Sequence, residues 1–372
     1  MGAAAAGTVD CTKRGPVKFS MFFEIQISQP TPQSEAQAFH DALEQAVFAD
    51  TLGYHCAWSV EHHGLLEYSH SSAPEVFLSF VAARTKRIRV GHGVTLLPFR
   101  YNHPIRIAER IATLDVLSGG RVNWGTGKSA SLVEQAAFEN DRATLHDQWL
   151  EALEIIPRMW SEPVFEYKGR FVDIPPIQVI PKPIQSPHPP IYAACSKPDT
   201  AALAGSLGIG ALNFAIGSDD YLTEKVEGYR RAVAQAKPHG RAVNNAFACT
   251  PVTLVLKDDR KACAQAFRGA RFFADTLSLY YLSGSRPTGQ LDVGRDFFPD
   301  DQLDEAMRMR NAPGSQVAVI AGDPVSARET VQRFVDIGVD ELLLVMATGT
   351  VPHDLVMESM RTFAEEVMPH FS

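Results

Sequence analysis

The stretch Trp58-Ser59-Val60-Glu61-His62-His63-Gly64 joins a short apolar run to the start of a helix. The apolar run is Gly53–Trp58, and Ala73-Pro74-Glu75 begins the helix, so the two histidines fall where a strand ends and a loop begins. In α/β proteins, functional sites are built from the loops at the carboxyl ends of parallel strands. The stretch therefore predicts a parallel α/β fold with a site at this strand end.

The same alternation of apolar runs and helical patterns continues from Val17 to the end of the chain, as is typical of βα units around a parallel sheet. Besides the strand that ends at 61–63, strands are expected at residues 17–23, 88–98, 122–127, 191–195, 209–214, 247–256, 317–322 and 341–346. Helices are expected at residues 34–52, 74–85, 104–117, 146–160, 198–206, 221–237, 262–282, 324–337 and 354–368. Because the total is close to eight strand–helix units, we expect a (β/α)8 TIM barrel, with a doubly wound sheet as the alternative.

Three segments depart from this alternation. Residues 1–16 contain an alanine run but lack the apolar core of a signal peptide, and we expect a disordered tail there. The Pro-rich residues 163–190 contain strand-like pieces and predict an inserted hairpin and loop. Residues 283–313 have many Gly, Pro, Asp and Arg and little periodicity, which predicts a mobile lid loop. The remainder, from 17 to 372, is expected to be a single domain.

The composition argues against several classes of function. The chain has 372 residues, 45% of them hydrophobic, so it can bury a large core. Its 35 Lys+Arg against 43 Asp+Glu give a net charge of -8, with no dense basic run, so neither nucleic acid nor a membrane is an expected partner. The five cysteines are far apart and form no C-x-x-C pair, so neither a disulfide framework nor a metal site is indicated. A cytoplasmic protein is expected.

Polar residues follow several of the predicted strands, and in a barrel these strand ends meet at one face. They include His62, Gly93-Val94, Lys128-Ser129 and Ser196-Lys197. His62 and His63 are adjacent and therefore point in different directions, so one can face the barrel mouth; a pair of structural loop histidines explains the same residues. Zinc is not favoured, because the stretch lacks the His-x-x-x-His spacing.

Two stretches suit an anion such as a phosphate. Gly125-Thr126-Gly127-Lys128-Ser129 ends like a P-loop, but the first glycine of that motif would fall at Val122, within a strand. Glycines, a lysine and hydroxyls after a strand still suit a bound phosphate. Cys195–Thr200 opens a helix with a proline in its first turn, where free N–H groups favour an anion. Taken alone, the first stretch is also explained by a solvated turn and the second by a helix cap. Two such stretches on one face of the barrel favour a phosphate-bearing cofactor.

Together these motifs resemble the bacterial luciferase-like flavin monooxygenases, from about Val17 to Phe371. The resemblance is carried by residues 18–23, Glu61-His62-His63, 90–98, His103-Pro104, 115–121, Gly125–Gly127, 190–194 and 322–324. It implies a TIM barrel with a mobile loop late in the chain. It also implies FMN, reduced by a separate NAD(P)H:flavin reductase, and O2, which adds to the flavin as a C4a-(hydro)peroxide that oxidises a small or medium organic substrate.

The resemblance also implies roles for individual residues. The family's catalytic histidine matches His62, where a neutral imidazole can relay a proton beside the flavin. The family has a non-proline cis peptide bond under the flavin ring where this chain has Gly93-Val94. It has a cysteine at the position of Gly127 and an arginine, directed to the phosphate, at that of Lys128. The residues matched to the cofactor are Gly93, Val94, Gly127, Lys128, Ser196, Lys197 and Thr200.

Two other functions compete with the monooxygenase. One is an F420-dependent oxidoreductase on the same barrel, which transfers hydride without oxygen; the resemblance argues against it, because the Glu-His-His signature belongs to the oxygenase branch. The other is a flavin-binding relative without catalysis. A homodimer is expected by analogy with relatives that pair through helices near the start of the barrel.

Overall fold

The computed structural model describes residues 15–281, 300–310 and 319–371. Eight strands form the central sheet: β1 (Lys18–Phe23), β2 (Cys56–Ser59), β3 (Arg89–Leu96), β4 (Val122–Gly127), β7 (Ile191–Ala194), β8 (Gly210–Phe214), β9 (Phe247–Thr250) and β12 (Glu341–Leu344). They pair in parallel and close into a barrel in the order β1-β12-β9-β8-β7-β4-β3-β2. The closed ring confirms the predicted (β/α)8 barrel and excludes the doubly wound sheet.

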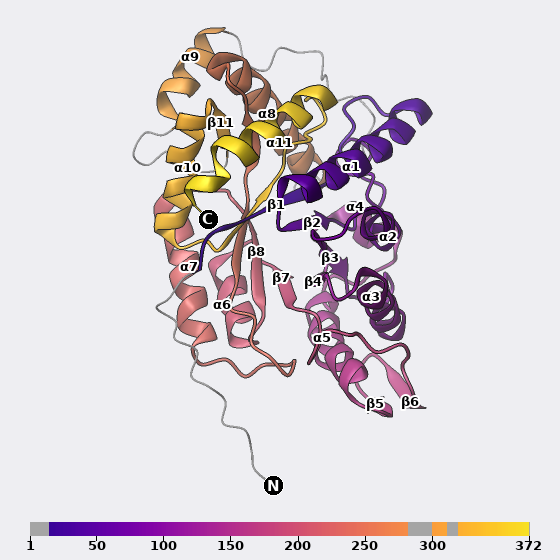
Figure 1. Ribbon diagram of the computed structural model, residues 1–372. Helices are drawn as coiled ribbons and strands as arrows, with labels where there is room; N and C mark the ends of the chain where they lie inside the picture. Colours follow the sequence, from indigo (N-terminus) through magenta and orange to yellow (C-terminus); the bar gives the residue numbers. More distant parts are fainter. Residues whose placement is uncertain (1–14, 282–299, 311–318, 372) are drawn as a thin grey trace.

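Helices connect successive strands and surround the barrel (Figure 1). They are α1 (Pro32–Leu52), α2 (Pro74–Arg84), α3 (Pro104–Ser118), α5 (Leu145–Ser161), α6 (Pro198–Ser206), α7 (Asp219–Val233), α10 (Pro324–Ile337) and α11 (His353–Glu366), with a final 3-10 turn η1 (Met368–His370). Five of them have proline in the first turn, where no N–H partner is lost. Helices α1, α3 and α10 end at glycines in the left-handed conformation, Gly53, Gly119 and Gly338.

The strands are buried on both faces, as parallel sheets are. On β1, Phe22 points into the barrel, whereas Phe19, Met21 and Phe23 pack against the surrounding helices. This alternation follows from the two-residue period of a strand. The barrel interior is therefore a packed apolar core, which leaves the strand ends for a functional site.

The predicted insertion at 163–190 contains an antiparallel hairpin of β5 (Phe165–Lys168) and β6 (Asp173–Ile177). It lies beside α5 at the edge of the molecule (Figure 1). The carboxylate of Glu151, on α5, accepts the backbone N–H groups of Arg170, Phe171 and Val172 in the hairpin loop. The prediction of an inserted hairpin is confirmed.

Two predicted strands need correction. The segment predicted as one strand at 247–256 divides at Pro251 into β9 and a separate strand, β10 (Val252–Val255). The predicted strand at 317–322 is β11 (Val319–Gly322), and it pairs in parallel with β10 in a two-stranded sheet instead of joining the barrel. The physical reason is that β12 and β8 already occupy both edges of β9. The eight barrel strands therefore exclude residues 317–322.

The predicted lid loop at 283–313 also needs correction. Helix α8 (Asp259–Tyr281) precedes it, and residues 300–309 within it form a helix, α9 (Asp300–Met309). Leu303, Ala306 and Met307 share one face of α9 and pack with Phe267 of α8 and Ala321 of β11. Their spacing of three and four residues is the helical signal that the polar composition obscured. Residues 283–299 and 311–313 of the predicted loop, and residues 1–14 of the predicted tail, lie outside the described residues.

A short helix, α4 (Leu132–Ala137), was not predicted. Ser131 caps its start by accepting a hydrogen bond from the backbone N–H of Glu134 at 3.4 Å. It lies in the connection between β4 and α5, so it places side chains above the carboxyl ends of the strands. In the part of the chain that the structure describes, we find no helix with the length and apolarity needed to cross a bilayer.

Candidate active site

The predicted site residues lie at the ends of four consecutive strands of the barrel. His62 follows β2, Gly93-Val94 lie in β3, Gly127-Lys128 end β4, and Ser196-Lys197 follow β7. Neighbouring strands are about 4.8 Å apart, so these residues extend over about 14 Å along the rim of the barrel. The structure thus brings together, in the predicted order, all the strand ends that the sequence singled out.

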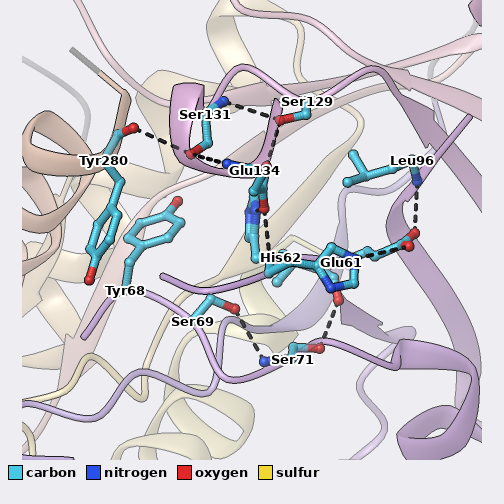
Figure 2. Close-up of polar contacts among 12 residues, drawn as sticks. Glu61, His62, Tyr68, Ser69, Ser71, Leu96, Ser129, Ser131, Glu134 and Tyr280 are labelled. Atoms are coloured by element: carbon cyan, nitrogen blue, oxygen red, sulfur yellow. Dashed lines mark hydrogen bonds and ion pairs between the residues drawn. The ribbon is translucent and has the colours of Figure 1, made fainter. Parts of the chain in front are cut away.

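His62 is held by a buried carboxylate. Its Nδ1 lies 2.9 Å from Oε1 of Glu134, on α4, and its backbone N–H donates to the carbonyl of Ser71 at 2.9 Å. Figure 2 shows Glu134 lying between the ring of His62 and the hydroxyl of Ser129, which donates to Oε2 at 2.5 Å. Only 13% of the His62 side chain is exposed. The ring is therefore fixed through Nδ1, and Nε2 is left to face the interior of the site.

The electrostatics of this pair favour ionised partners. Burial by itself would lower the pKa of His62, but the charge of Glu134 and its hydrogen bond to the ring outweigh burial, and the pKa is raised above its usual value. Burial likewise opposes ionisation of Glu134, but His62, Ser129 and the N–H of His63 hold the pKa of that carboxyl below its usual range. The resemblance implies a neutral imidazole, and the charge of Glu134 shifts the ring from that form toward the protonated one.

A second carboxyl group and two tyrosines face the other side of the ring. Oε2 of Glu24, which follows β1, lies 3.9 Å from Nε2 of His62, and the hydroxyl of Tyr281 lies 3.3 Å from the same nitrogen. Tyr68 donates to Oε1 of Glu24 at 3.1 Å, and its ring meets that of His62 edge-on at 5.4 Å. Burial raises the pKa of Glu24 to about 7, against the opposing effects of His62 and Tyr68. These groups make a largely enclosed site with one basic ring and two acids.

The other two residues of the Glu-His-His stretch support the loop. Glu61 accepts the backbone N–H of Leu96 and the amide of Asn102, both at 2.8 Å, and so ties this loop to the end of β3. His63 packs against Phe138 and Tyr101, which also contact each other, and its ring is parallel to that of Tyr101. The side chain of His63 thus packs within the loop, whereas that of His62 faces the site.

The strands next to His62 approach each other closely. The peptide bond between Gly93 and Val94 is cis, at the position where the sequence predicted it. A Cβ atom on Gly127 would lie 2.5 Å from Cγ2 of Val94, and one on Gly93 would lie 3.1 Å from the ring of Phe22. Glycine at 127 is therefore required by the side chain of Val94, which explains why the family's cysteine cannot be accommodated in this packing.

The two predicted anion-binding stretches lie side by side, because β4 pairs with β7 through Thr126 and Ala193. The side chain of Lys128 is exposed, and its ammonium lies 3.4 Å from Nδ1 of His146 on α5. Burial of its stem lowers the pKa of Lys128. Ser196 and Lys197 are exposed just before α6.

Thr200 contributes to the cap of α6. Its hydroxyl accepts the N–H of Lys197 at 3.1 Å and donates to the carbonyl of the same residue at 2.8 Å. Its side chain is therefore occupied in capping α6, which was the alternative explanation of this stretch. A phosphate at this corner would be held by Lys128, Ser196 and Lys197 instead.

Sequence reasoning missed Glu24, Tyr68, Glu134, His146 and Tyr281, which are all close to predicted site residues. One signal was available for Glu134: Ser131 and Glu134 have the spacing of a helix cap, which marks the start of α4. Glu24 directly follows β1, so the strand-end rule could have found it. Tyr68, His146 and Tyr281 carry no local signal, because they reach the site through packing of the loop after β2, of α5 and of α8. No cluster of three or more His, Cys, Asp or Glu side chains suited to a metal ion occurs within 15–281, 300–310 and 319–371.

Comparison with models of protein families shows to which family the chain belongs. The model of the luciferase-like monooxygenases matches residues 17–341, which is most of the chain. The chain belongs to the luciferase-like monooxygenase family. The crystal structure of the monooxygenase RslO1 from Streptomyces bottropensis covers 95% of this chain and all of that one, with 25% identity and a TM-score of 0.80. The luciferase-like form of the barrel is thereby established as well.

Relatives in this family use two kinds of cofactor. The oxygenase component of the flavin-dependent trigonelline monooxygenase of Acinetobacter baylyi is 25% identical, with 96% of each chain covered. The F420-dependent glucose-6-phosphate dehydrogenase of Amycolatopsis mediterranei is 26% identical, with 88% of this chain and 93% of that one covered. Two further matches, at 34% and 30% identity, extend over only 50% and 48% of the matching proteins. The protein is thus an oxidoreductase of the luciferase-like family.

Proposed function

We propose that this protein is the oxygenase component of a two-component flavin monooxygenase, which uses reduced FMN and O2 to oxygenate a small or medium organic substrate. The observation that carries the proposal is the His62–Glu134 pair, buried beside the close approach of β3 and β4. A proton donor fixed in this way at the edge of a cofactor cradle is what oxygen activation on a flavin requires.

The residues present fit FMN. Exposed ammonium groups of Lys128 and Lys197 and the hydroxyl of Ser196 lie at the β4–β7 corner, where they suit the phosphate. Gly93, Val94 and Gly127 lie between that corner and His62, so a flat ring placed over them would reach the imidazole. Reduced FMN supplies the two electrons with which O2 is activated. The protein supplies orientation, a dry environment and protons.

His62 would act as the proton donor. The charge of Glu134 raises its pKa and so favours the protonated ring, and its Nδ1 is occupied by Glu134. The proton that can leave is therefore the one on Nε2, which faces the interior of the site. After that transfer the ring is neutral and can take a proton back, which meets the need for both an acid and a base in one catalytic cycle.

The surroundings of His62 favour an apolar substrate. Tyr68 and Phe273 pack with Phe214, Leu277 and Tyr281 in the apolar cluster that also fills the barrel interior. These side chains exclude water from the reacting groups. Buried acidic groups at the site, Glu24 and Glu134, disfavour a substrate whose reacting part is an anion.

Two partners follow from the proposal. One is a separate NAD(P)H:flavin reductase that supplies reduced FMN. The other is a second copy of this chain, because α2 and α3 pack together and expose large apolar side chains. Val76 and Phe80 on α2 are 55% and 60% exposed, and Leu117 on α3 is 71% exposed. Large exposed apolar side chains on two helices packed together support an interaction surface there.

The test is to mix the protein with chemically reduced FMN under anaerobic conditions, add 18O2, and screen apolar organic substrates by mass spectrometry. We expect one 18O atom in the product, and reoxidation of FMN at a rate that differs from that of free FMN. His62→Ala should abolish product while FMN binding is retained. His63→Ala is the matched control, because His63 packs against Tyr101 and Phe138 and does not face the site.

Two outcomes would overturn the proposal. Reduction of F420 by an alcohol or a sugar phosphate, without FMN-dependent oxygenation, would place the protein in the dehydrogenase branch. Tight binding of oxidised FMN without oxygen-dependent turnover of any substrate would make it a flavin carrier. Full turnover by the His62→Ala variant would remove His62 from the mechanism.

A further inference from the structure

Glu24 is a buried acid with one oxygen that no hydrogen bond from the described residues satisfies. It follows β1 directly and is 1% exposed. Its Oε1 accepts the hydroxyl of Tyr68, whereas Oε2 has no hydrogen-bond partner in the described part of the chain. A buried polar atom without a partner is costly to folding, so its retention points to a function.

The unpartnered oxygen is directed at the catalytic ring. Oε2 of Glu24 lies 3.9 Å from Nε2 of His62. The titratable groups around the pair are Tyr68 from the loop after β2, Glu134 from α4 and Tyr281 from α8, with Glu61 acting on His62 from further away. Among these groups, His62 is the one that can carry a positive charge.

The two carboxyl groups beside His62 are not equivalent. Glu134 accepts three hydrogen bonds, from His62, Ser129 and the N–H of His63, which suits a permanent carboxylate. Glu24 accepts a single one and keeps an oxygen free, so it can hold a proton there. Glu134 therefore orients the ring, and Glu24 is left to exchange protons with it.

We propose that Glu24 is the proton store for His62. When His62 gives its Nε2 proton to the reacting group, the carboxylic acid of Glu24 transfers its own proton to Nε2; Glu24 becomes a carboxylate and His62 becomes an imidazolium again. The proton returns to Glu24 from solvent or product at the end of the cycle. The inference rests on the proposed function in so far as His62 serves a reacting group.

The transfer distance is compatible with one bridging group. At 3.9 Å the two atoms are beyond direct hydrogen-bonding distance. The hydroxyl of Tyr281, 3.3 Å from Nε2, can donate to one atom and accept from the other, as can a water molecule. Tyr281 belongs to the end of α8, so the relay depends on this helix being docked over the barrel mouth.

The test uses Glu24→Gln, which keeps an acceptor for Tyr68 but cannot hold the proton. Glu67→Gln is the matched control, because Glu67 is equally buried and accepts the hydroxyl of Tyr280 at 2.6 Å without facing His62. The full chain without cofactor is labelled with 15N-histidine, and the His62 signals are assigned by their loss in His62→Gln. Their shifts are then followed against pH.

We expect the midpoint of the His62 titration to fall by about one pH unit in Glu24→Gln and to stay unchanged in Glu67→Gln. Wild-type protein should also show an infrared carboxylic acid band that disappears as Glu24 ionises and that Glu24→Gln lacks. An unchanged midpoint in Glu24→Gln, or absence of the band difference, would overturn the inference. If Glu24→Gln does not fold, Glu24→Asp serves instead, with a smaller fall expected because its carboxylate is withdrawn from the ring.

Catalysis provides an independent measure. In the active enzyme, the pH dependence of kcat should include the ionisation of Glu24, and the Glu24→Gln variant should lose this ionisation. The Glu67→Gln variant should keep the pH dependence of the wild type. The histidine titration needs neither cofactor nor substrate, so it stands even if the protein proves not to be an oxygenase. Conversely, normal oxygenation with an unchanged histidine titration would refute the role of Glu24 alone.

Discussion

One oxygen of Glu134, Oε1, lies 2.9 Å from both Nδ1 of His62 and the backbone nitrogen of His63. A single buried carboxylate thus fixes the ring and the loop that carries it, and it does so from a helix 71 residues further along the chain. The position of His62 therefore depends on the folding of the β4–α5 connection as much as on its own strand. A substitution of Glu134 can therefore measure how much the orientation of the ring contributes to the reaction, while the imidazole itself is kept.

Glu134→Gln should lower the rate of product formation about 100-fold, because the amide can accept a hydrogen bond but cannot stabilise the imidazolium. The same change should cost about 1–3 kcal/mol of unfolding free energy through the weakened buried hydrogen bonds. Steady-state kinetics and urea denaturation measure the two effects. Glu139→Gln is the control, since Glu139 forms an exposed ion pair with Arg100; equal rates for the two variants would contradict the orienting role.

Gly127→Ala should reduce FMN affinity and destabilise the protein by about 1–3 kcal/mol, because the added methyl group would lie 2.5 Å from Cγ2 of Val94. Truncating the clashing partner in the double variant Gly127→Ala/Val94→Ala should restore part of both losses. Thermal denaturation and fluorescence titration with FMN are the measurements. Gly228→Ala, in helix α7 with open space around it, should be neutral or slightly stabilising, and no recovery in the double variant would refute the packing argument.

Lys128→Ala should weaken FMN binding about tenfold and make it less dependent on salt, whereas Lys128→Arg should bind at least as tightly, because a guanidinium can hold a phosphate with two hydrogen bonds. Isothermal titration at two ionic strengths gives both quantities. The exposed Lys237, which follows α7, provides the control variant Lys237→Ala. If Lys128→Ala and Lys237→Ala bind FMN equally well, the phosphate is held elsewhere.

His92 predicts a pH dependence of stability. Its ring is buried on the outer side of β3, where burial lowers its pKa to about 4, and neither ring nitrogen has a hydrogen-bond partner in the described chain. Below pH 6.5 the unfolded chain takes up a proton that the native ring refuses until about pH 4, so stability falls as the pH drops through this window.

The loss attributable to His92 is about 3 kcal/mol when complete. Urea unfolding between pH 7 and pH 4 should therefore show a steeper decline for the wild type than for His92→Gln. His40→Gln, at an exposed position on α1, should decline as the wild type does. Parallel curves for all three proteins would show that His92 titrates normally.

Phe80→Asp tests the proposed dimer surface on α2 and α3. A charge at this exposed apolar position should convert a dimer into monomers, which light scattering coupled to gel filtration would detect. Val164→Asp, at another exposed apolar position outside α2 and α3, is the control and should leave the mass unchanged. A monomeric wild type would refute the homodimer outright.

The sequence predicted the fold more completely than the site. Strands buried on both faces and helices that begin with proline and end with glycine carry local signals, and these placed the barrel units correctly. Three elements were missed or misassigned because their cause is not local. Helix α4 is too short to show a period, β11 pairs with β10 because the barrel has no free edge, and α9 is stabilised by packing against α8.

For the site, the strand-end rule and the resemblance located His62 and the cofactor rim, but they did not locate the groups that control His62. Glu24 directly follows an apolar strand and gives no sign that its charge is buried. Burial comes from Tyr68 and from the end of α8, at Tyr281, more than 200 residues away in the chain. Contacts between residues so far apart in the chain leave no spacing pattern that a single sequence could show.

The two-stranded sheet of β10 and β11 has a consequence for how this protein can change over time. It brings the two ends of the 256–318 segment together at neighbouring strands, outside the hydrogen-bonded ring of the barrel. Residues can therefore be gained, lost or replaced between these strands without shifting the register of any barrel strand. Helix α8 belongs to this segment and ends at Tyr281, beside His62. Changes of length or sequence after Tyr281 therefore leave both the barrel and the hydroxyl group beside His62 in place.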